Sequence, residues 1–192
     1  MELIFATNNK HKLSEVVPLL DDRFDLLSLE DISCREDIPE DQDTLEGNAS
    51  QKAWYIYNKY QKSCFADDTG LEIEALKGNP GVISARYAGQ QRSAQDNMRK
   101  VLEEMKGENN RNARFRTVIS LIWQGREYQF EGVVEGSIIA QQKGGEGFGY
   151  DPIFIPENHQ ETFAEMELKE KNKISHRSRA INKLVTFLNQ HI

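Results

Sequence analysis

The sequence lacks the features that mark membrane-spanning, secreted and disulfide-rich proteins. No apolar run in its 192 residues approaches the roughly 20 residues that cross a bilayer, and no signal-like segment follows Met1. Its two cysteines, Cys34 and Cys64, have no CxxC partner, which excludes a cysteine metal site and argues against a disulfide framework. We therefore expect a cytoplasmic protein with free, buried cysteines and no membrane partner.

The sequence also lacks the basic surface of a nucleic-acid-binding protein and the histidine spacing of a zinc site. Its net charge is −7, from 24 Lys and Arg against 31 Asp and Glu, so we expect no nucleic-acid partner. The four histidines, His11, His159, His176 and His191, do not have zinc-ligand spacing. A chain of this length is expected to form a single domain, residues 1–192, with two lobes that share a core.

Hydrophobic periodicity predicts an α/β fold. From Lys10 onward, apolar residues recur at i, i+3, i+4 and i+7, which is typical of a helix, and Pro18 should kink or shorten it. Further helices are expected to begin after the capping residues Thr44, Ser93, Thr162 and Ser175. Strands are expected over residues 3–7, 24–29, 63–66, 71–76, 115–123 and 153–155, with an antiparallel meander through 128–130, 133–134 and 137–140.

The most informative feature is a pair of adjacent carboxylates, Asp67 and Asp68. They follow the apolar run 63–66 and precede Thr69 and Gly70, so we expect them where a buried strand ends, a common place for sites in α/β proteins. Two neighbouring carboxylates repel, and burying them is costly unless a cation such as Mg2+ compensates. The alternative is a solvated turn, because Asp, Thr and Gly all favour turns.

Basic residues gather at two predicted helix starts. Lys10, His11 and Lys12 occupy the first turn of the first helix, and His176 and Arg177 occupy that of the last. Cations at a helix N-terminus oppose its dipole, so a bound anion would explain both placements. Two solvated basic faces are the alternative.

A glycine cluster over residues 144–149 is followed closely by aromatic and acidic side chains. It lacks the strand–loop–helix setting of a dinucleotide fingerprint and the Lys-Ser or Lys-Thr ending of a phosphate-binding P-loop. Its permissive backbone beside Phe148 and Tyr150 suits a planar ligand packed against a ring. A wide hairpin loop with inward-packed aromatics is the alternative.

Five short segments, in this order, resemble the inosine triphosphate pyrophosphatase family. They are ATNNKHK at 6–12, ADDTGL at 66–71, SARY at 84–87, GFGYDP at 147–152 and SHR at 175–177. The resemblance spans nearly the whole chain. It implies an elongated mixed β-sheet flanked by helices, two lobes with a central nucleotide cleft, and a homodimer. It also implies magnesium-dependent hydrolysis of ITP, dITP and XTP to the monophosphate and pyrophosphate.

The same resemblance implies roles for individual residues. Asp68 would be the catalytic carboxylate and a metal ligand, with Asp67 and Glu46 as further candidates for the metal. The triphosphate would be held by Thr7, Asn8, Asn9, Lys10, His11 and Lys12, with Thr69 beside the ligand. The base pocket and nucleotide contacts would come from Phe148, Gly149, Tyr150, Asp151, Lys171, His176 and Arg177.

The chain departs from the family pattern at two positions. Asn8 stands where a Gly is common, and Gly47 stands where a metal-binding Glu is usual. Glu46 precedes that position by one residue, a rotation of about 100° on a helix, so Asp67 and Glu72 are also candidates to complete the metal site.

Base selectivity would follow from donors to the purine 6-oxo group, either backbone N–H groups or the side chains of His176 and Arg177. Two other functions remain open: a non-catalytic nucleotide-binding regulatory module, and a related pyrophosphatase acting on dTTP and UTP.

Overall fold

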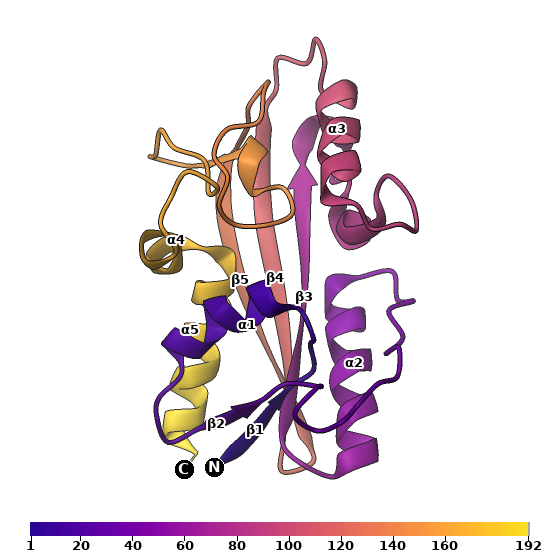
Figure 1. Cartoon of the computed structure of the whole chain (residues 1–192), viewed down its shortest axis with the longest axis vertical. Helices are drawn as coiled ribbons and strands as arrows, with labels where there is room; N and C mark the ends of the chain where they lie inside the picture. Colours follow the sequence, from indigo (N-terminus) through magenta and orange to yellow (C-terminus); the bar gives the residue numbers. More distant parts are fainter. Residues whose placement is uncertain (192) are drawn as a thin grey trace. The chain divides into compact units, whose positions relative to one another are not determined.

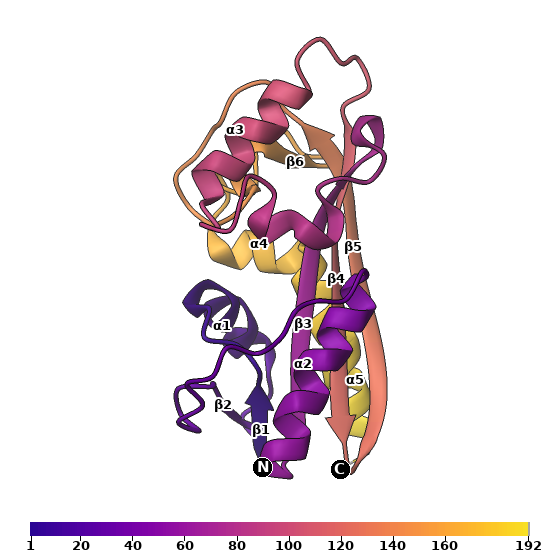
Figure 2. The same cartoon turned by 90° about the vertical axis from the view of Figure 1, so that its right-hand side faces the viewer.

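The computed structural model describes residues 1–191, which form a six-stranded sheet with flanking helices. The strand order is β2-β1-β3-β4-β5-β6 (Figures 1 and 2). β1 pairs in parallel with β2 and β3, and β5 pairs antiparallel with β6, so the sheet is mixed. The strands are β1 (Glu2–Phe5), β2 (Asp25–Leu27), β3 (Cys64–Ile73), β4 (Asn112–Trp123), β5 (Arg126–Ile138) and β6 (Phe154–Pro156).

Five α-helices and four short 3-10 helices lie among the described residues 1–191. The α-helices are α1 (Lys10–Val16), α2 (Leu45–Tyr60), α3 (Ala94–Glu104), α4 (Leu168–Ile174) and α5 (His176–Gln190). The 3-10 helices are η1 (Val17–Leu19), η2 (Glu74–Leu76), η3 (Gly81–Arg86) and η4 (Asp151–Ile153). None of the helices in this part of the chain is long and apolar enough to cross a membrane.

Local capping explains where three helices begin, as the sequence predicts. The Asn9 side chain accepts hydrogen bonds from the backbone N–H groups of His11 and Lys12 at the start of α1. Thr44 caps α2 and Ser93 caps α3 in the same way. Pro18 lies in η1, directly after α1, where its ring ends the regular helix.

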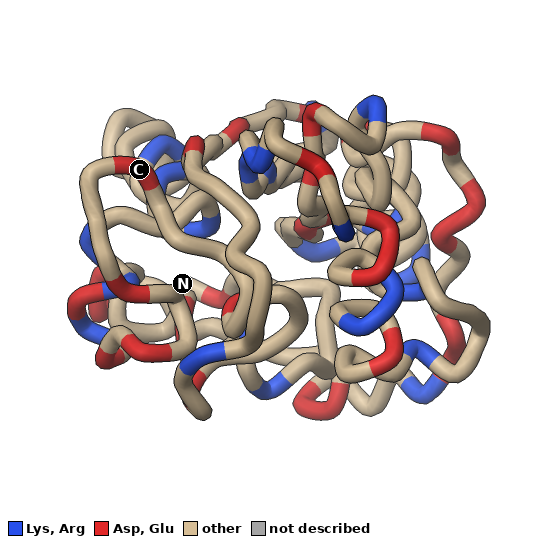
Figure 3. Tube along the Cα trace, turned by 90° about the horizontal axis from the view of Figure 1, so that it is seen from above, with Lys and Arg blue, Asp and Glu red and all other residues tan. Residues whose placement is uncertain are grey.

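The chain divides into two compact units. Unit 1 comprises residues 1–68, 117–132 and 177–192, and unit 2 comprises residues 69–116 and 133–176. Basic and acidic residues occur along the whole trace (Figure 3), but the segment 30–46 carries eight Asp and Glu against one Arg, a charge equal to the net −7 of the chain.

Unit 1 has a hydrophobic core on each face of its strands. Leu3, Phe5 and Phe65 belong to the cluster that contains α5, whereas Ile4 and Cys64 belong to the cluster that contains α2. Successive residues of a strand point to opposite faces, so this division follows directly from the pleat. Figures 1 and 2 show α2 and α5 on opposite faces of the strands.

Unit 2 buries a separate core. Leu71 and Ile73 of β3 pack with Met98, Val101 and Met105 of α3, together with phenylalanines that include Phe115, Phe154 and Phe163. The two methionines are therefore core residues.

Three predictions for the elements are wrong. The segments 63–66 and 71–76 are not separate strands, because β3 runs unbroken from Cys64 to Ile73 beside β4. The segments after the Gly125 turn form one long strand, β5, in which Gly136 packs so tightly on β6 that a Cβ would lie 2.3 Å from the Ile155 carbonyl oxygen.

The third error concerns the short helix expected after Thr162. The Thr162 hydroxyl donates to the carbonyl of Lys143 at 3.0 Å. The N–H of Glu165 donates to the Thr162 carbonyl in a turn, and the next helix, α4, begins only at Leu168.

Candidate active site

The aspartate pair lies on β3, just beyond the carboxyl end of its parallel neighbour β1. The last residue pair between β1 and β3 is Phe5 with Phe65, and the Ala6 N–H donates to the Phe65 carbonyl at 2.8 Å. The chain then leaves β1, while β3 continues through Asp67 and Asp68. The pair is therefore in mid-strand and not at the end of its own strand, but it does lie next to the carboxyl end of β1, the kind of place where α/β sites collect.

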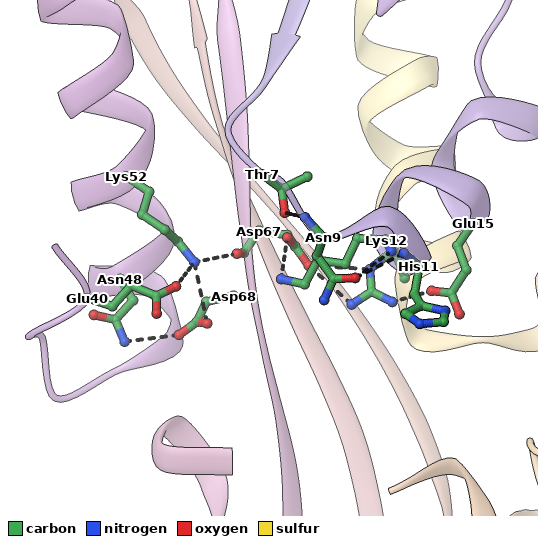
Figure 4. A network of polar contacts seen from close by, with 11 residues as sticks. Thr7, Asn9, His11, Lys12, Glu15, Glu40, Asn48, Lys52, Asp67 and Asp68 are labelled. Atoms are coloured by element: carbon green, nitrogen blue, oxygen red, sulfur yellow. Dashed lines mark hydrogen bonds and ion pairs between the residues drawn. The ribbon is translucent and has the colours of Figure 1, made fainter. Parts of the chain in front are cut away.

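The pleat of β3 places the two carboxylates in different surroundings. Asp67 shares its face with Phe65, toward α1 and α5, and Asp68 shares its face with Ala66, toward α2. Figure 4 shows Asp67 among side chains of α1 and Asp68 among side chains of α2. Adjacent residues in the sequence thus acquire separate partners and separate electrostatics.

Asp67 is buried in a network of cations. Its carboxylate accepts hydrogen bonds from Lys12 Nζ at 2.7 Å and from Arg177 Nε and Nη2 at 3.3 Å, and it is 2% exposed. Arg177 also binds Glu15 of α1. Burial alone would raise the pKa of Asp67, but the charges of Lys12, Arg177 and Lys52 hold it well below the ordinary range.

The Asp67 network accounts for one residue in each of the two basic helix starts. Lys12 and Arg177 are both directed at an internal carboxylate. Asp67 lies in a buried strand, which rules out a solvated turn as the explanation of the pair. The anion that compensates these two cations in the folded protein is therefore Asp67 itself.

Asp68 is less strongly paired. Its Oδ2 accepts a hydrogen bond from Asn48 Nδ2 at 3.0 Å, and its Oδ1 lies 3.6 Å from Lys52 Nζ. The side chain is 14% exposed, so an incoming molecule can reach it. Burial raises the pKa of Asp68 despite the opposing charges of Lys52 and Lys12 and the Asn48 hydrogen bond. A carboxylate with a raised pKa is a better proton acceptor near neutral pH.

Glu40 joins Asp68 through Lys52. Lys52 Nζ donates to Glu40 Oε1 at 2.5 Å and to the backbone carbonyl of Asp67 at 2.8 Å (Figure 4). Two carboxylates from different segments, Glu40 and Asp68, thus converge on a single cation. Glu40 could not be predicted from the sequence as a site residue, because it lies in an irregular acidic stretch whose only signal is its charge.

Two other proposed metal ligands, Glu46 and Glu72, have contacts of their own. Glu46 stands in the first turn of α2, and its backbone carbonyl accepts a hydrogen bond from Gln129. Glu72 is in unit 2, where it pairs with Arg114 at 2.6 Å and lies 3.7 Å from Arg116. Among residues 1–191, no group of three or more His, Cys, Asp or Glu side chains is arranged to hold a metal ion.

The glycine loop of unit 2 is held by a buried ion pair. Asp151 Oδ2 accepts hydrogen bonds from the Phe148 N–H at 2.8 Å and from Lys171 Nζ at 2.7 Å, and both charged side chains are 3% exposed. Lys171 Nζ lies 5.2 Å from the centre of the Phe148 ring. Tyr150 packs inward and donates to the Ser84 carbonyl at 2.7 Å, while Phe148 remains half-buried.

The backbone of the glycine loop favours glycine at three positions of the predicted cluster. Gly144, Gly147 and Gly149 have φ of +83°, +75° and +65°, values that glycine adopts without strain.

The remaining predicted residues divide between the two units. In unit 1, the Thr7 hydroxyl accepts from the Asn9 N–H at 3.1 Å, and the side chains of Asn8, Asn9, Lys10 and His11 are exposed. Asn8 does not adopt a left-handed backbone, so it replaces the expected glycine without strain.

In unit 2, Thr69 is half-buried in β3. His176 is 3% exposed, and its ring stacks on Phe115 with the ring centres 4.6 Å apart. These two residues complete the predicted set.

The fold and the site define a class of protein: an α/β protein whose mixed sheet carries a carboxylate–lysine centre beside the carboxyl end of β1. The chain belongs to the Ham1 family, whose model matches residues 3–187.

Curated relatives match nearly the full length of this chain. It is 53% identical over 188 residues to the "dITP/XTP pyrophosphatase" of Flavobacterium johnsoniae, with 98% of each chain covered. It is 46% identical over 191 residues to the protein of the same name from Bacillus subtilis, covering 97% of this chain and 96% of that one.

Solved structures match as well. "The structure of the Staphylococcus aureus Ham1 protein" covers 100% of both chains with a TM-score of 0.91 and 35% identity. These findings confirm the family resemblance drawn from the five segments and the predicted α/β fold with a mixed sheet.

Proposed function

We propose that this protein hydrolyses the non-canonical purine nucleoside triphosphates ITP, dITP and XTP to the nucleoside monophosphate and pyrophosphate. The names of its relatives support this activity. The observation that carries the proposal is the division of the aspartate pair by the pleat of β3. Asp67 is paired with two cations, Lys12 and Arg177, whereas Asp68 is partly exposed and its pKa is raised.

In this proposal Asp68 is the catalytic residue. Its carboxylate orients a water molecule and accepts its proton as the water attacks the α-phosphorus, and pyrophosphate leaves. Lys12, whose side chain is 16% exposed, supplies positive charge to the phosphates. Asn9 already accepts the N–H groups of His11 and Lys12. The positive charge for the phosphates at the start of α1 therefore comes from side chains such as Lys12, and not from the N–H groups of His11 and Lys12.

The residues around Asp68 fit a magnesium ion (Mg2+). Mg2+ is usually bound by one or two protein carboxylates, with water and substrate phosphates completing its coordination. Asp68 and Glu40 are such a pair, since both already face one ammonium group. When bound, the ion would neutralise charge on the phosphates. Asp68 and Glu40 would hold it, and Asn48 would orient Asp68.

Base selectivity in this proposal is a matter of hydrogen-bond donors. Hypoxanthine and xanthine carry a 6-oxo acceptor where adenine carries a 6-amino donor. With ATP bound, a donor of the pocket would face the 6-amino group, and both donors would stay without an acceptor. The Arg177 guanidinium is buried against Asp67 and Glu15, and the His176 ring is stacked on Phe115. These contacts already engage both side chains, so the proposal takes backbone N–H groups as the donors.

A substrate panel tests the proposed activity. Pyrophosphate release is measured with ITP, XTP, ATP and dTTP, each with Mg2+ and with EDTA. We expect rapid release from ITP and XTP with Mg2+, little from ATP or dTTP, and none with EDTA. Preference for dTTP, or tight nucleotide binding without any release, would contradict the proposal.

The same proposal includes a homodimer working in the cytoplasm. Sedimentation velocity of the purified protein tests the oligomeric state, with a mass near twice 22.1 kDa as the expected result. A sedimenting species of 22.1 kDa at assay concentrations would contradict the dimer.

A further inference from the structure

The segment 40–44, which we call the Glu40 strap, is fastened to the first two turns of α2. The Gln42 N–H donates to Asn48 Oδ1 at 2.9 Å. The Asp41 carboxylate accepts from Gln51 Nε2 at 2.6 Å, and Thr44 caps the helix. These contacts hold the strap against α2. Its first residue, Glu40, is the partner of Lys52.

Asn48 connects the strap to Asp68. Its side chain is 1% exposed and uses both ends of the amide: Oδ1 accepts from the strap, and Nδ2 donates to Asp68 at 3.0 Å. Rotating the amide by half a turn would place donor against donor and acceptor against acceptor, so the two bonds define one orientation. One buried side chain therefore holds a carboxylate of β3 and the backbone of the strap at the same time.

Gly47 makes room for the strap. A Cβ at position 47 would lie 2.8 Å from Gln42 Cβ and 3.1 Å from Thr44 Oγ1, so the strap would have to move outward. Gly47 is an ordinary helical residue without a positive φ. Backbone freedom therefore does not explain this glycine, whereas the close approach of Gln42 does.

We infer that Gly47 and Asn48 are positioning residues that hold the carboxylates of Glu40 and Asp68 together as one cation-binding pair. This inference rests on the proposed function and deepens it. Gly47 permits the strap to close on α2, and Asn48 locks the strap to Asp68. In this inference Gly47 contributes to the proposed metal site by leaving room for the strap, although it provides no ligand.

The test is the affinity of the protein for Mn2+ alone, measured from the free-ion signal by electron paramagnetic resonance in the absence of nucleotide. Substituting a residue that orients metal ligands usually weakens affinity by about 10- to 100-fold. We expect a loss of that size for Asn48→Ala and for Gly47→Ala. Asn58→Ala, at an exposed asparagine of the same helix, should leave the affinity unchanged.

Stability provides a second readout for Gly47→Ala. In a helix without the strap, alanine would raise the unfolding free energy relative to glycine. We expect weakened Mn2+ binding with no such gain. The loss of affinity should be smaller in a Gln42→Gly background, where the colliding Cβ is absent.

Unchanged Mn2+ affinity in Asn48→Ala, or a stabilised Gly47→Ala variant that binds Mn2+ like the wild type, would overturn the inference. Glu40→Gln and Asp68→Asn separate this failure from failure of the proposed function. If these two variants lose Mn2+ while the positioning variants do not, only the positioning roles are wrong. If Glu40→Gln and Asp68→Asn both bind Mn2+ like the wild type, the proposed metal site itself is wrong.

Discussion

Two neighbouring isosteric substitutions, Asp67→Asn and Asp68→Asn, should have different effects on stability. Asp67→Asn removes the negative charge that Lys12 meets at 2.7 Å and Arg177 at 3.3 Å, and leaves both cations without it. Breaking a buried ion pair by removing one partner typically costs about 3–5 kcal/mol. Since a domain is stable by only about 5–15 kcal/mol, Asp67→Asn should lose a large fraction of its stability.

Asp68→Asn is the matched control. Burial raises the pKa of Asp68, so the folded state disfavours its charge, and neutralising it should leave the unfolding free energy unchanged or higher. Guanidinium chloride denaturation with EDTA measures both variants. Removing Lys12 as well, with Lys12→Met, should recover part of the loss in Asp67→Asn, because one stranded cation is gone. Equal losses for Asp67→Asn and Asp68→Asn would refute the reasoning.

The effect of Asp67 should also depend on pH. Its pKa is lowered by folding, so its contribution is fully present above the unfolded value of about 3.9 and is lost as the pH falls through the lowered folded value. The stability gap between wild type and Asp67→Asn should therefore be constant from about pH 6 to pH 8 and shrink below about pH 4. A gap that widens in acid would contradict this assignment.

Two further predictions concern buried groups. Burial raises the pKa of the Cys64 thiol to about 12, so Ellman's reagent should not label it at pH 8 until denaturant is added; rapid labelling of the native protein would show that it is accessible. Lys171→Met should cost about 3–5 kcal/mol in guanidinium denaturation, because it leaves the Asp151 carboxylate buried without its ammonium. The double variant with Asp151→Asn should lose less than the single one, and strictly additive losses would argue against the pair.

Local signals made much of the fold predictable from the sequence. The capping side chains of Asn9, Thr44 and Ser93 act within three residues of themselves, so their effect is visible in a short window. The predicted break between the strands 63–66 and 71–76 is wrong because it also rests on a short window of sequence. Thr69 and Gly70 favour turns locally, but they continue β3 because its neighbour β4 continues beside them.

The candidate site was predictable in its centre and not in its surroundings. The sequence identified the aspartate pair but not the separation of its members, which requires knowing that β3 continues. Pairing of Lys12 and Arg177 with Asp67 spans 55 and 110 residues. The 12-residue separation of Glu40 and Lys52 crosses an irregular loop. None of these three contacts follows a helix or strand period in the sequence, so only the tertiary structure reveals that these basic residues pair with internal carboxylates.

The most direct test of the central claim is pyrophosphate release from ITP by wild type and Asp68→Asn with saturating Mg2+, alongside equilibrium binding of ITP. We predict that wild type releases pyrophosphate and that kcat of Asp68→Asn falls by about 10²- to 10⁴-fold, the usual contribution of a general base, while ITP binding persists. An Asp68→Asn variant that turns ITP over at the wild-type rate, or a wild-type enzyme that releases inorganic phosphate in place of pyrophosphate, would contradict the account.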